Sequence, residues 1–526
     1  MAPPPPAFFN ISDEFVSRPA SEHPDRVAIL GVDREVTYSG LEKEVNRVAR
    51  ALRDSNCRPG DRVLIILPDS LEFIASFFGA AKIGAIAVPV NSMARAADYR
   101  HFLSDSGAAI AIVHWSVLAE VLTGAASMPL TRLVVVGGTR RAVEYMSRSV
   151  AHWSDWLPGQ AAETASHETA LTDPAFFLYT SGSGGPPKAA VHRHQDMPAC
   201  SEGFAKGVLG LRADDRTFSV SKLFFAYGLG NGMYFPFFVG ASTILYPDRP
   251  RADRVIEVVE RFKPTVFFSV PTFYASLLRE EEKGRRADFS SVRVAVSAGE
   301  SLPAEIFLRF RERFGIEILD GIGSTEMLHM FLSARPGEAR PGSCGREVPG
   351  YEARILGDKG DEPVGNRDIG SLWVKGGSAF SEYWNLPELT ACSRQGDWVL
   401  TGDKFTRDAD GFYHYCGRSD DMMKVAGMWV SPSEVENALL SHPAVAEAAV
   451  VAHADSVGIT RTIGFVVLSP GIIQPAGGLD SEIHAWVHTR LVGYKCPHEI
   501  RFVSELPKTA TGKIQRFVLR QPAAQS

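Results

Sequence analysis

Short apolar runs that alternate with amphipathic segments are the feature that most restricts the fold of this chain. Residues 62–66 predict a buried strand, residues 70–83 a helix and residues 85–90 a second strand, which together form a βαβ unit. The alternation returns further on, with strands predicted at 109–113, 132–136, 265–270 and 292–296 and a helix at about 304–314. This pattern indicates mostly parallel sheets covered by helices on both faces, with ligands at the carboxyl ends of the strands.

The pattern changes from about residue 371, where short β-like pieces separated by turns replace the longer units. After a polar turn at residues 417–421 a smaller unit follows, with helices near 432–440 and 481–491 and strands near 446–452 and 462–468. We therefore predict an α/β fold with two domains. Residues 1–419 form a large domain of parallel-rich sheets with a β-rich subdomain, and residues 420–526 form a small, mobile α+β domain.

Composition narrows the class of protein. A chain of 526 residues is long enough for more than one domain. A formal net charge of -6 argues against a nucleic-acid partner, because no basic excess is available to neutralise phosphates. The six cysteines show no C-x-x-C spacing, which favours reduced thiols over disulfides or a zinc site. With no signal-peptide pattern and no apolar run of membrane-spanning length, we expect a cytoplasmic protein without membrane insertion.

Residues 176–188 contain the densest chemistry of the chain. An apolar run ends in Thr180, and the residues that follow supply hydroxyls (Ser181, Ser183), glycines (Gly182, Gly184, Gly185) and the cation of Lys188. Glycines let backbone N–H groups approach an anion closely, so the stretch suits a polyphosphate. It does not match the P-loop, in which a lysine opens a helix, because Pro187 precedes Lys188. Taken alone, it could equally be a mobile surface loop with a solvated lysine.

Four further cassettes follow in order: Gly299-Glu300, Gly323-Ser324-Thr325-Glu326, Thr401-Gly402-Asp403 and the segment from Pro507 to Lys513. Each is weak alone, but the order and spacing of all five resemble the adenylate-forming family of acyl-CoA synthetases, luciferases and peptide-synthetase adenylation domains. The resemblance covers nearly the whole chain. It implies that a carboxylate attacks the α-phosphate of ATP, giving an acyl-adenylate and pyrophosphate, in a site that works by positioning and preorganised positive charge.

The resemblance assigns roles to residues of these cassettes. It implies three catalytic groups: Lys513 between the carboxylate and the α-phosphate, Glu326 as the ligand of Mg²⁺, and Thr325 beside it. Glu326 could instead cap a helix, and Lys513 could be one more lysine of a basic tail. The implied nucleotide-binding residues are Thr180, Ser181, Gly182, Ser183, Gly184, Gly185, Lys188, Gly299, Glu300, Ser301, Asp320, Ile322, Gly323, Ser324, Asp403 and Arg418.

Lys513 lies so far along the chain that it reaches the nucleotide only if the small domain folds over the large one. In the family that domain swings about a hinge, matched here by Asp420, to present a second face. That face would direct Lys424, Gly427 and Trp429 toward coenzyme A. Lys424 and Trp429 could equally be a solvated lysine and a packing aromatic.

Within the family, residues 222–231, 323–329 and 419–425 resemble benzoate- and 4-hydroxybenzoate-coenzyme A ligases. The match implies an acid pocket that suits an aryl ring. Its implied lining is Ala226, Tyr227, Phe235, Gly323, His329 and Met330. A hydrogen bond from His329 or Tyr227 to a ring hydroxyl would accept a hydroxybenzoate.

Two departures from the family pattern concern the phosphate loop. Gly184 stands where the family usually has threonine, and Ala189 where it usually has glycine. We expect the lost hydroxyl to slow adenylation without abolishing it. A third departure, Met330 in place of isoleucine, gives the acid pocket a more adaptable wall.

The sequence thus predicts an AMP-forming aryl-CoA ligase that uses ATP, Mg²⁺ and coenzyme A on benzoate or a hydroxybenzoate, with a homodimer allowed. Two alternatives stay open. The chain could load its acyl group onto a carrier domain, or it could be a nucleotide- or acyl-binding regulator that has lost catalysis.

Overall fold

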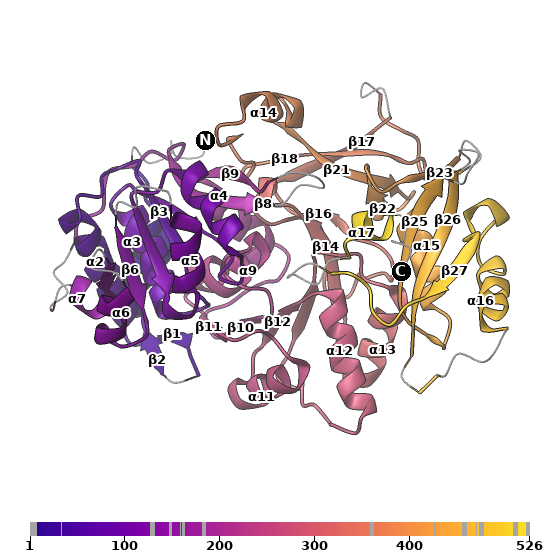
Figure 1. Cartoon of the computed structure of the whole chain (residues 1–526), viewed down its shortest axis with the longest axis horizontal. Coiled ribbons are helices and arrows are strands. Elements are labelled where there is room, and N and C mark those ends of the chain that lie inside the picture. Colours follow the sequence, from indigo (N-terminus) through magenta and orange to yellow (C-terminus); the bar gives the residue numbers. More distant parts are fainter. Residues whose placement is uncertain are drawn as a thin grey trace.

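The computed structural model describes residues 8–32, 34–126, 132–146, 150–157, 159, 164–180, 186–357, 362–425, 428–454, 460–469, 471–472, 478–508 and 514–521. Within these residues, two large sheets form the main part of the molecule, and a smaller body built from the end of the chain lies beside them (Figure 1).

The first large sheet has eight strands among the described residues, and its central strands are parallel. In sheet order they are β19 (Glu382–Tyr383), β9 (Lys188–Arg193), β8 (Pro174–Thr180), β4 (Ile86–Pro89), β3 (Arg62–Ile66), β5 (Ile110–His114), β6 (Leu133–Val136) and β7 (Val150–His152). Strand β9 runs antiparallel to β8, and β19 antiparallel to β9. The predicted βαβ unit is present as β3, α3 (Leu71–Lys82) and β4.

The second large sheet has nine described strands, again with a parallel centre. In order they are β16 (Arg346–Glu347), β15 (Met330–Ser333), β14 (Ile318–Gly323), β13 (Val294–Ser297), β12 (Val266–Ser269), β10 (Arg216–Ser219), β11 (Ser242–Ile244), β1 (Val27–Leu30) and β2 (Glu35–Thr37). Its antiparallel pairs lie at the edges, where β15 follows β14 and β2 follows β1.

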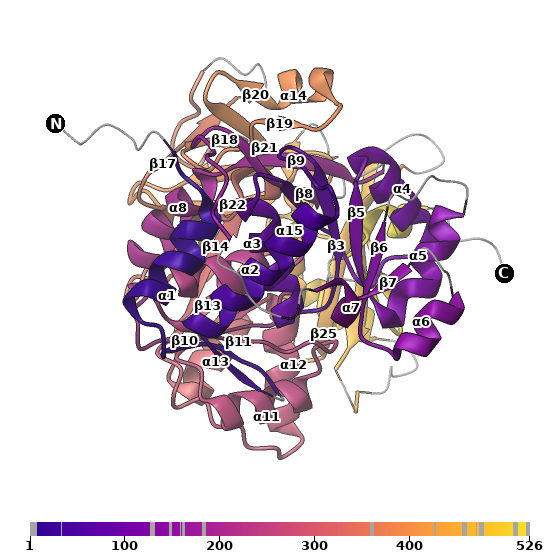
Figure 2. The ribbon, with the colours of Figure 1, turned by 90° about the vertical axis from the view of Figure 1, so that its left-hand side faces the viewer.

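Helices cover both sheets and fill the space between them (Figures 1 and 2). Helix α3 is buried on nearly all sides, as expected for an apolar helix between two sheets, and it packs with α2 (Tyr38–Asp54). Alternate residues of one strand face opposite layers: Phe268 of β12 joins the central core, whereas Phe267 packs under the outer helices. The outer helices are α4 (Ala96–Ser106) and α5 (Leu118–Ala125) on one sheet, and α11 (Ala252–Phe262), α12 (Pro271–Glu282) and α13 (Ala304–Phe314) on the other.

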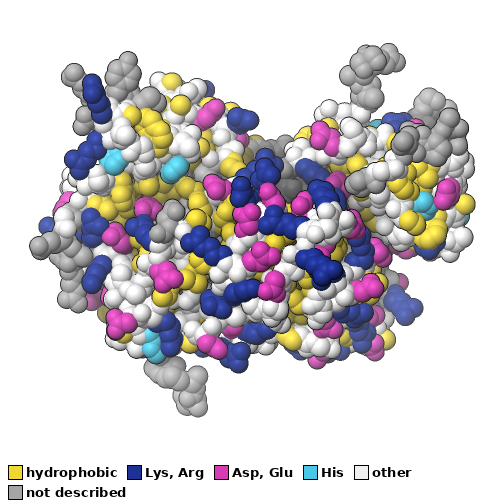
Figure 3. Space-filling model, turned by 90° about the horizontal axis from the view of Figure 1, so that it is seen from below, with side chains coloured by type: hydrophobic (Ala, Val, Ile, Leu, Met, Phe, Trp, Pro, Cys, Tyr) yellow, Lys and Arg dark blue, Asp and Glu magenta, His cyan; other side chains and the backbone are white. Residues whose placement is uncertain are grey.

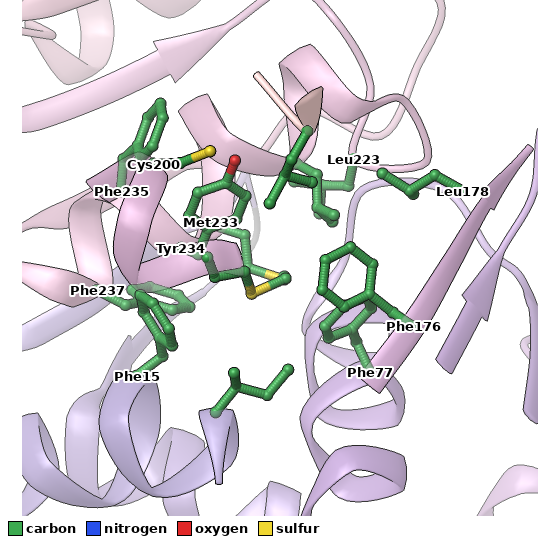
Figure 4. Packing of buried hydrophobic residues seen from close by; sticks show 14 of the residues in the cluster. Phe15, Phe77, Phe176, Leu178, Cys200, Leu223, Met233, Tyr234, Phe235 and Phe237 are labelled. Carbon is green, nitrogen blue, oxygen red and sulfur yellow. The ribbon is translucent and has the colours of Figure 1, made fainter. Parts of the chain in front are cut away.

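The central core continues under the segment that carries the predicted acid pocket. Figure 4 shows Phe235 and Phe237, from α10 (Phe235–Phe238), with Phe15, Tyr234 and Cys200 among the apolar side chains around them. Phe235 and Phe237 are fully buried. This packing fixes the backbone on which the pocket residues sit.

A third sheet corresponds to the predicted β-rich subdomain. Its described strands are β17 (Tyr351–Leu356), β18 (Gly370–Gly376), β21 (Trp398–Arg407) and β20 (Arg394–Gln395), with β22 (Tyr413–Arg418) paired to β21.

The end of the chain builds the smaller body. It holds the hairpin of β23 (Met423–Val425) and β24 (Met428–Val430), a sheet of β25 (Val445–Ala454), β26 (Thr460–Leu468) and β27 (Glu499–Phe502), and the helices α15 (Pro432–Leu440), α16 (Leu479–His488) and α17 (Arg516–Leu519). The apolar side chains of this body form two hydrophobic clusters of their own, a larger one within residues 423–502 and a smaller one of Ala449, Val451, Ile463, Phe465 and Leu506. This body therefore does not depend on the large domain for its interior.

On the face seen in Figure 3, Lys and Arg side chains are interspersed with Asp and Glu. Among the described residues, no helix is both long enough and apolar enough to span a bilayer.

Candidate active site

The predicted phosphate loop connects two antiparallel strands. β8 ends at Thr180, β9 begins at Lys188, and these two residues are paired in register. Lys188 thus opens a strand and not a helix, in agreement with the distinction drawn from the P-loop. Residues Ser181, Gly182, Ser183, Gly184 and Gly185 lie outside the described residues.

The carboxylate of Glu326 lies on a short 3-10 turn, Thr325–Met327, that follows β14. The hydroxyl of Tyr383 donates a hydrogen bond to Glu326 Oε1 at 2.6 Å. The ammonium of Lys188 lies 4.4 Å from the centre of the Tyr383 ring. Burial, and then the nearby Glu326 charge, raise the pKa of Tyr383, so it remains a donor at neutral pH. Tyr383 therefore links two predicted site residues that come from different sheets.

Sequence reasoning missed Tyr383. It lies 57 residues after Glu326, in the two-residue strand β19, and no local motif surrounds it. Only the pairing of β19 with β9 brings it to the site.

The predicted adenine-side residues lie where β13 and β14 end. Gly299, with φ of +91°, turns the chain directly after β13, and Glu300 and Ser301 follow it. Asp320 of β14 is paired in register with Ser297, and burial raises the pKa of its carboxyl well above the usual range. Ile322, Gly323 and Ser324 continue the same strand end and are partly exposed.

At Gly323 the backbone of β14 comes very close to the backbone of His329. A Cβ atom at this position would meet the His329 carbonyl oxygen at 2.4 Å. Glycine is therefore needed between the nucleotide cassette and the predicted acid pocket.

Asp403 and Arg418 face each other across β21 and β22. Arg418 Nη1 donates to Asp403 Oδ1 at 3.1 Å and to the Thr401 carbonyl oxygen, also at 3.1 Å. Burial of Arg418 disfavours its charge, but the Asp403 carboxylate outweighs this effect and raises the pKa of Arg418. Arg418 thus fixes the orientation of the Asp403 carboxylate, which is the acceptor that the predicted contact with a ribose requires.

The predicted acid pocket is an aromatic cluster around His329. Its ring centre lies 4.6 Å from that of Phe235 and 5.4 Å from that of Tyr227. The side chain is 2% exposed, and burial lowers the pKa of His329 to about 3, which keeps the imidazole neutral. Ala226 opens the helix α9 (Ala226–Leu229) next to Tyr227, and Met330 is buried in β15.

Two of the three polar atoms of these rings already have partners, whereas the buried Nδ1 of His329 has none among the described residues. The Tyr227 hydroxyl lies 3.3 Å from the carbonyl oxygens of Ser269 and Val296, and His329 Nε2 lies 3.1 Å from Asn231 Oδ1. A hydrogen bond from the Tyr227 hydroxyl or from His329 Nε2 to a ring hydroxyl would have to compete with these contacts.

The predicted residues of the C-terminal domain are only partly described. Lys424 and Trp429 are paired across the β23–β24 hairpin, but their side chains, together with Gly427 and Lys513, lie outside the described residues. Asp420 lies in the turn directly after β22.

The donor set at Glu326 suits Mg²⁺ bound together with a nucleotide. Among the described residues there is no group of three or more His, Cys, Asp or Glu that could hold a metal ion by itself. Mg²⁺ typically takes one or two carboxylates, with phosphate oxygens and water completing its shell. Glu326 presents one such carboxylate, oriented by Tyr383.

Comparison with known proteins agrees with this geometry. Residues 16–384 match the family described as AMP-binding enzyme, and residues 434–513 match the AMP-binding enzyme C-terminal domain. This chain therefore belongs to the AMP-binding, adenylate-forming enzyme family.

Individual relatives are similar over nearly the full length. A benzoate–CoA ligase from Thauera aromatica is 43% identical over 487 residues, which are 92% of this chain and 90% of that protein. A 4-hydroxybenzoate–CoA/benzoate–CoA ligase from Rhodopseudomonas palustris (strain ATCC BAA-98 / CGA009) is 38% identical over 515 residues, 98% and 94% of the two chains. The crystal structure of a benzoate CoA ligase from Burkholderia xenovorans LB400 superposes with a TM-score of 0.90 at 40% identity, covering 98% of this chain and 100% of that one. The predictions of family and fold class are confirmed.

Proposed function

We propose that this protein is an AMP-forming aryl-CoA ligase that joins benzoate or a hydroxybenzoate to coenzyme A. One observation carries the choice of acid: the cluster of Tyr227, Phe235 and His329 directly adjoins the turn that bears Glu326. Aromatic walls beside a nucleotide site suit a flat aryl acid better than an alkyl chain.

In the first step the acid's carboxylate oxygen attacks the α-phosphorus of ATP, and the bond from the α-phosphorus to the bridging oxygen breaks. Pyrophosphate leaves, and the aryl-adenylate remains. Lys188 and the phosphate loop would bind the departing phosphates, and Asp403 with Arg418 would hold the ribose. Lys513 would supply positive charge between the two reacting groups. Mg²⁺, when bound, would neutralise charge on the phosphates.

In the second step the thiolate of coenzyme A attacks the carbonyl carbon of the adenylate. The bond from that carbon to the phosphate oxygen breaks, and AMP leaves. Lys424, Gly427 and Trp429 would guide the pantetheine arm after the small domain has turned about Asp420. A boundary between residues 419 and 420 is part of this proposal, and the separate core of residues 423–502 supports it.

Substrate-dependent consumption of coenzyme A tests the function. Free thiol is measured with ATP and Mg²⁺ across benzoate, its 2-, 3- and 4-hydroxy derivatives, 2-aminobenzoate, cyclohexanecarboxylate and a medium-chain fatty acid. We expect turnover with benzoate or a hydroxybenzoate and at least about tenfold less with the two non-aromatic acids. Preference for the fatty acid would contradict the proposal.

Benzoate-dependent exchange of pyrophosphate into ATP separates the alternatives. A regulator without catalysis shows no exchange. A carrier-loading protein shows exchange but forms no thioester with free coenzyme A. A homodimer and a cytoplasmic location complete the proposal, and sedimentation velocity of the purified protein tests the first of these.

A further inference from the structure

The short turn that carries Glu326 is held from outside at three successive carbonyl groups. The Thr325 carbonyl oxygen lies 2.8 Å from His192 Nε2. The Glu326 carbonyl accepts from the backbone N–H of Phe380 at 2.7 Å, and the Met327 carbonyl accepts from Ser378 Oγ at 2.7 Å. A carbonyl oxygen only accepts, so His192 donates from Nε2.

His192 differs from the other two donors because it belongs to the sheet of the phosphate loop. It lies on β9, four residues after Lys188 at the start of the strand. The turn it contacts follows β14 of the other sheet. A single side chain thus ties the strand that begins at the phosphate-binding lysine to the turn of the predicted metal carboxylate.

The ring of His192 is itself fixed. Its side chain and that of Asp196 are both 0% exposed, and Nδ1 lies 2.9 Å from Asp196 Oδ2. The same carboxylate oxygen accepts from the backbone N–H of Arg193 at 3.0 Å, and Arg193 Nη2 lies 3.2 Å from Oδ1. The imidazole also stacks on Phe176, with ring centres 5.1 Å apart and planes inclined by 15°. Asp196 and Phe176 therefore leave the ring one orientation, with Nε2 toward Thr325.

We propose that His192, oriented by Asp196, is a positioning residue for adenylation, because it sets the place of the Glu326 carboxylate relative to the phosphate loop. The inference rests on the proposed function. A histidine that only fills the core would affect stability alone. A positioning histidine affects how strongly a divalent ion tightens the binding of ATP.

Two variants of similar polarity separate these roles. Glutamine in His192→Gln reaches about as far as Nε2 and keeps a donor for Thr325, whereas asparagine in His192→Asn reaches only about as far as Nδ1 and contacts Asp196 instead. The readout is the ratio of the ATP dissociation constants without and with Mn²⁺, measured by calorimetry on the full-length protein without any acid, so that no turnover occurs. We expect this ratio to fall about tenfold in His192→Asn and to stay within about threefold of the wild type in His192→Gln.

A second readout follows the exchange reaction. In His192→Asn we expect kcat for benzoate-dependent pyrophosphate exchange to fall about tenfold, with the KM for benzoate unchanged. His194→Asn is the matched control. His194 is 1% exposed, lies just after β9, and uses Nδ1 to accept from the backbone N–H of Ile11 at 3.2 Å, away from the turn. This variant should lose thermal stability and keep the wild-type ratio.

Equal ratios in His192→Asn and His192→Gln overturn the inference while leaving the proposed function in place. If wild-type protein binds no ATP in the presence of Mn²⁺, the proposed function fails and the inference fails with it. If His192→Asn does not fold, Asp196→Asn serves instead; about a threefold loss of the ratio supports the inference, and a wild-type ratio overturns it.

Discussion

Tyr383 shows how one hydroxyl can set the geometry of a predicted metal site. It donates to Glu326 Oε1, and its ring lies under the ammonium of Lys188. The hydrogen bond thereby orients the carboxylate that would contribute a ligand to a Mg²⁺ ion bound with phosphates.

Replacing Tyr383 by phenylalanine keeps the ring and removes the hydrogen bond. A hydrogen bond to a charged group contributes roughly 1.5–3 kcal/mol, so we expect exchange at limiting Mg²⁺ to fall about tenfold or more. The Mg²⁺ concentration for half-maximal exchange should rise. Tyr413→Phe is a matched control, because the Tyr413 hydroxyl donates to Glu347 Oε1 at the same 2.6 Å. An unchanged Mg²⁺ dependence in Tyr383→Phe would show that the hydrogen bond from Tyr383 does not affect how Glu326 binds the ion.

At Gly184 a hydroxyl can be added instead of removed, because the family usually has threonine at this position. Restoring the hydroxyl with Gly184→Thr should raise kcat/KM for ATP about tenfold, because one donor to a phosphate is regained. Initial rates at subsaturating ATP measure the change. No gain would mean that the backbone N–H groups and Lys188 already bind the phosphates fully.

His329 makes the stability of the protein depend on pH. Its pKa is about 3 in the folded chain and 6.5 in the reference state, so below pH 6.5 the unfolded chain binds a proton that the folded chain does not. The contribution of neutral, buried His329 to the free energy of unfolding is therefore complete above pH 6.5 and is lost as the pH falls toward 3. Between pH 7.5 and 5.5 the loss is roughly 1.4 kcal/mol.

His329→Gln removes this titration, and His194, whose pKa burial also lowers, is retained in both proteins and cancels. We expect the apparent Tm of the variant to fall about 2 °C less than that of the wild type over this pH interval. Equal falls would mean that His329 is protonated, or reached by water, in the folded protein.

At the level of elements, the end of the sheet opposite the site has its own polar cluster. Asp215, Thr265 and Arg293 directly precede the parallel strands β10, β12 and β13. Arg293 contacts Asp215 through two bonds of 2.9 and 2.6 Å, and Thr265 Oγ1 donates to Asp215 Oδ1 at 2.7 Å. The cluster holds three strands in register far from the nucleotide-binding end.

Asp215→Asn should therefore destabilise the protein by about 2 kcal/mol, because Arg293 loses its charged partner, while the kinetic constants stay unchanged. Urea unfolding and steady-state kinetics measure the two effects. Asp288→Asn removes an exposed ion pair with Lys263 and should change stability by less than about 0.5 kcal/mol. A loss of activity at constant stability in Asp215→Asn would contradict this division of roles.

Elements with a strong periodic pattern could be predicted from the sequence. Strand β3 matches its predicted range, and helices α13 and α15 end where the apolar period ends. Which strands share a sheet could not be predicted, because the apolar runs of parallel strands look alike. β19, with two residues, has no period at all. For that reason Glu326 was found from its cassette, whereas Tyr383 and the His192–Asp196 pair needed the three-dimensional structure.

At the scale of the whole molecule, the proposed mechanism needs the C-terminal domain to bring Lys513 to the nucleotide. The tail after Lys513 is attached to the segment at the proposed hinge, since Arg516 and Arg520 both pair with Asp421. Any turn of the domain about Asp420 therefore carries the lysine with it.

Lys513→Ala should reduce benzoate-dependent AMP release and pyrophosphate exchange about a hundredfold or more, because the developing charge loses its cation. Thioester formation from supplied benzoyl-adenylate should stay within about threefold of the wild type. Lys508→Ala is the control, because Lys508 lies in the same C-terminal segment as Lys513 but forms an ion pair with Glu447 of β25 at 2.6 Å. AMP release that is untouched in Lys513→Ala would remove the basis of the assigned mechanism.

The small body has its own hydrophobic core, formed mainly by residues 423–502. We expect that such a unit can be exchanged between related enzymes while the core of the recipient's large domain stays unchanged. Under the proposed mechanism, Lys513 and the surface proposed for the thioester step would be transferred together, while the choice of acid would stay with the recipient. Acid preference and the rate of handover to the thiol can thus evolve, or be engineered, independently of each other.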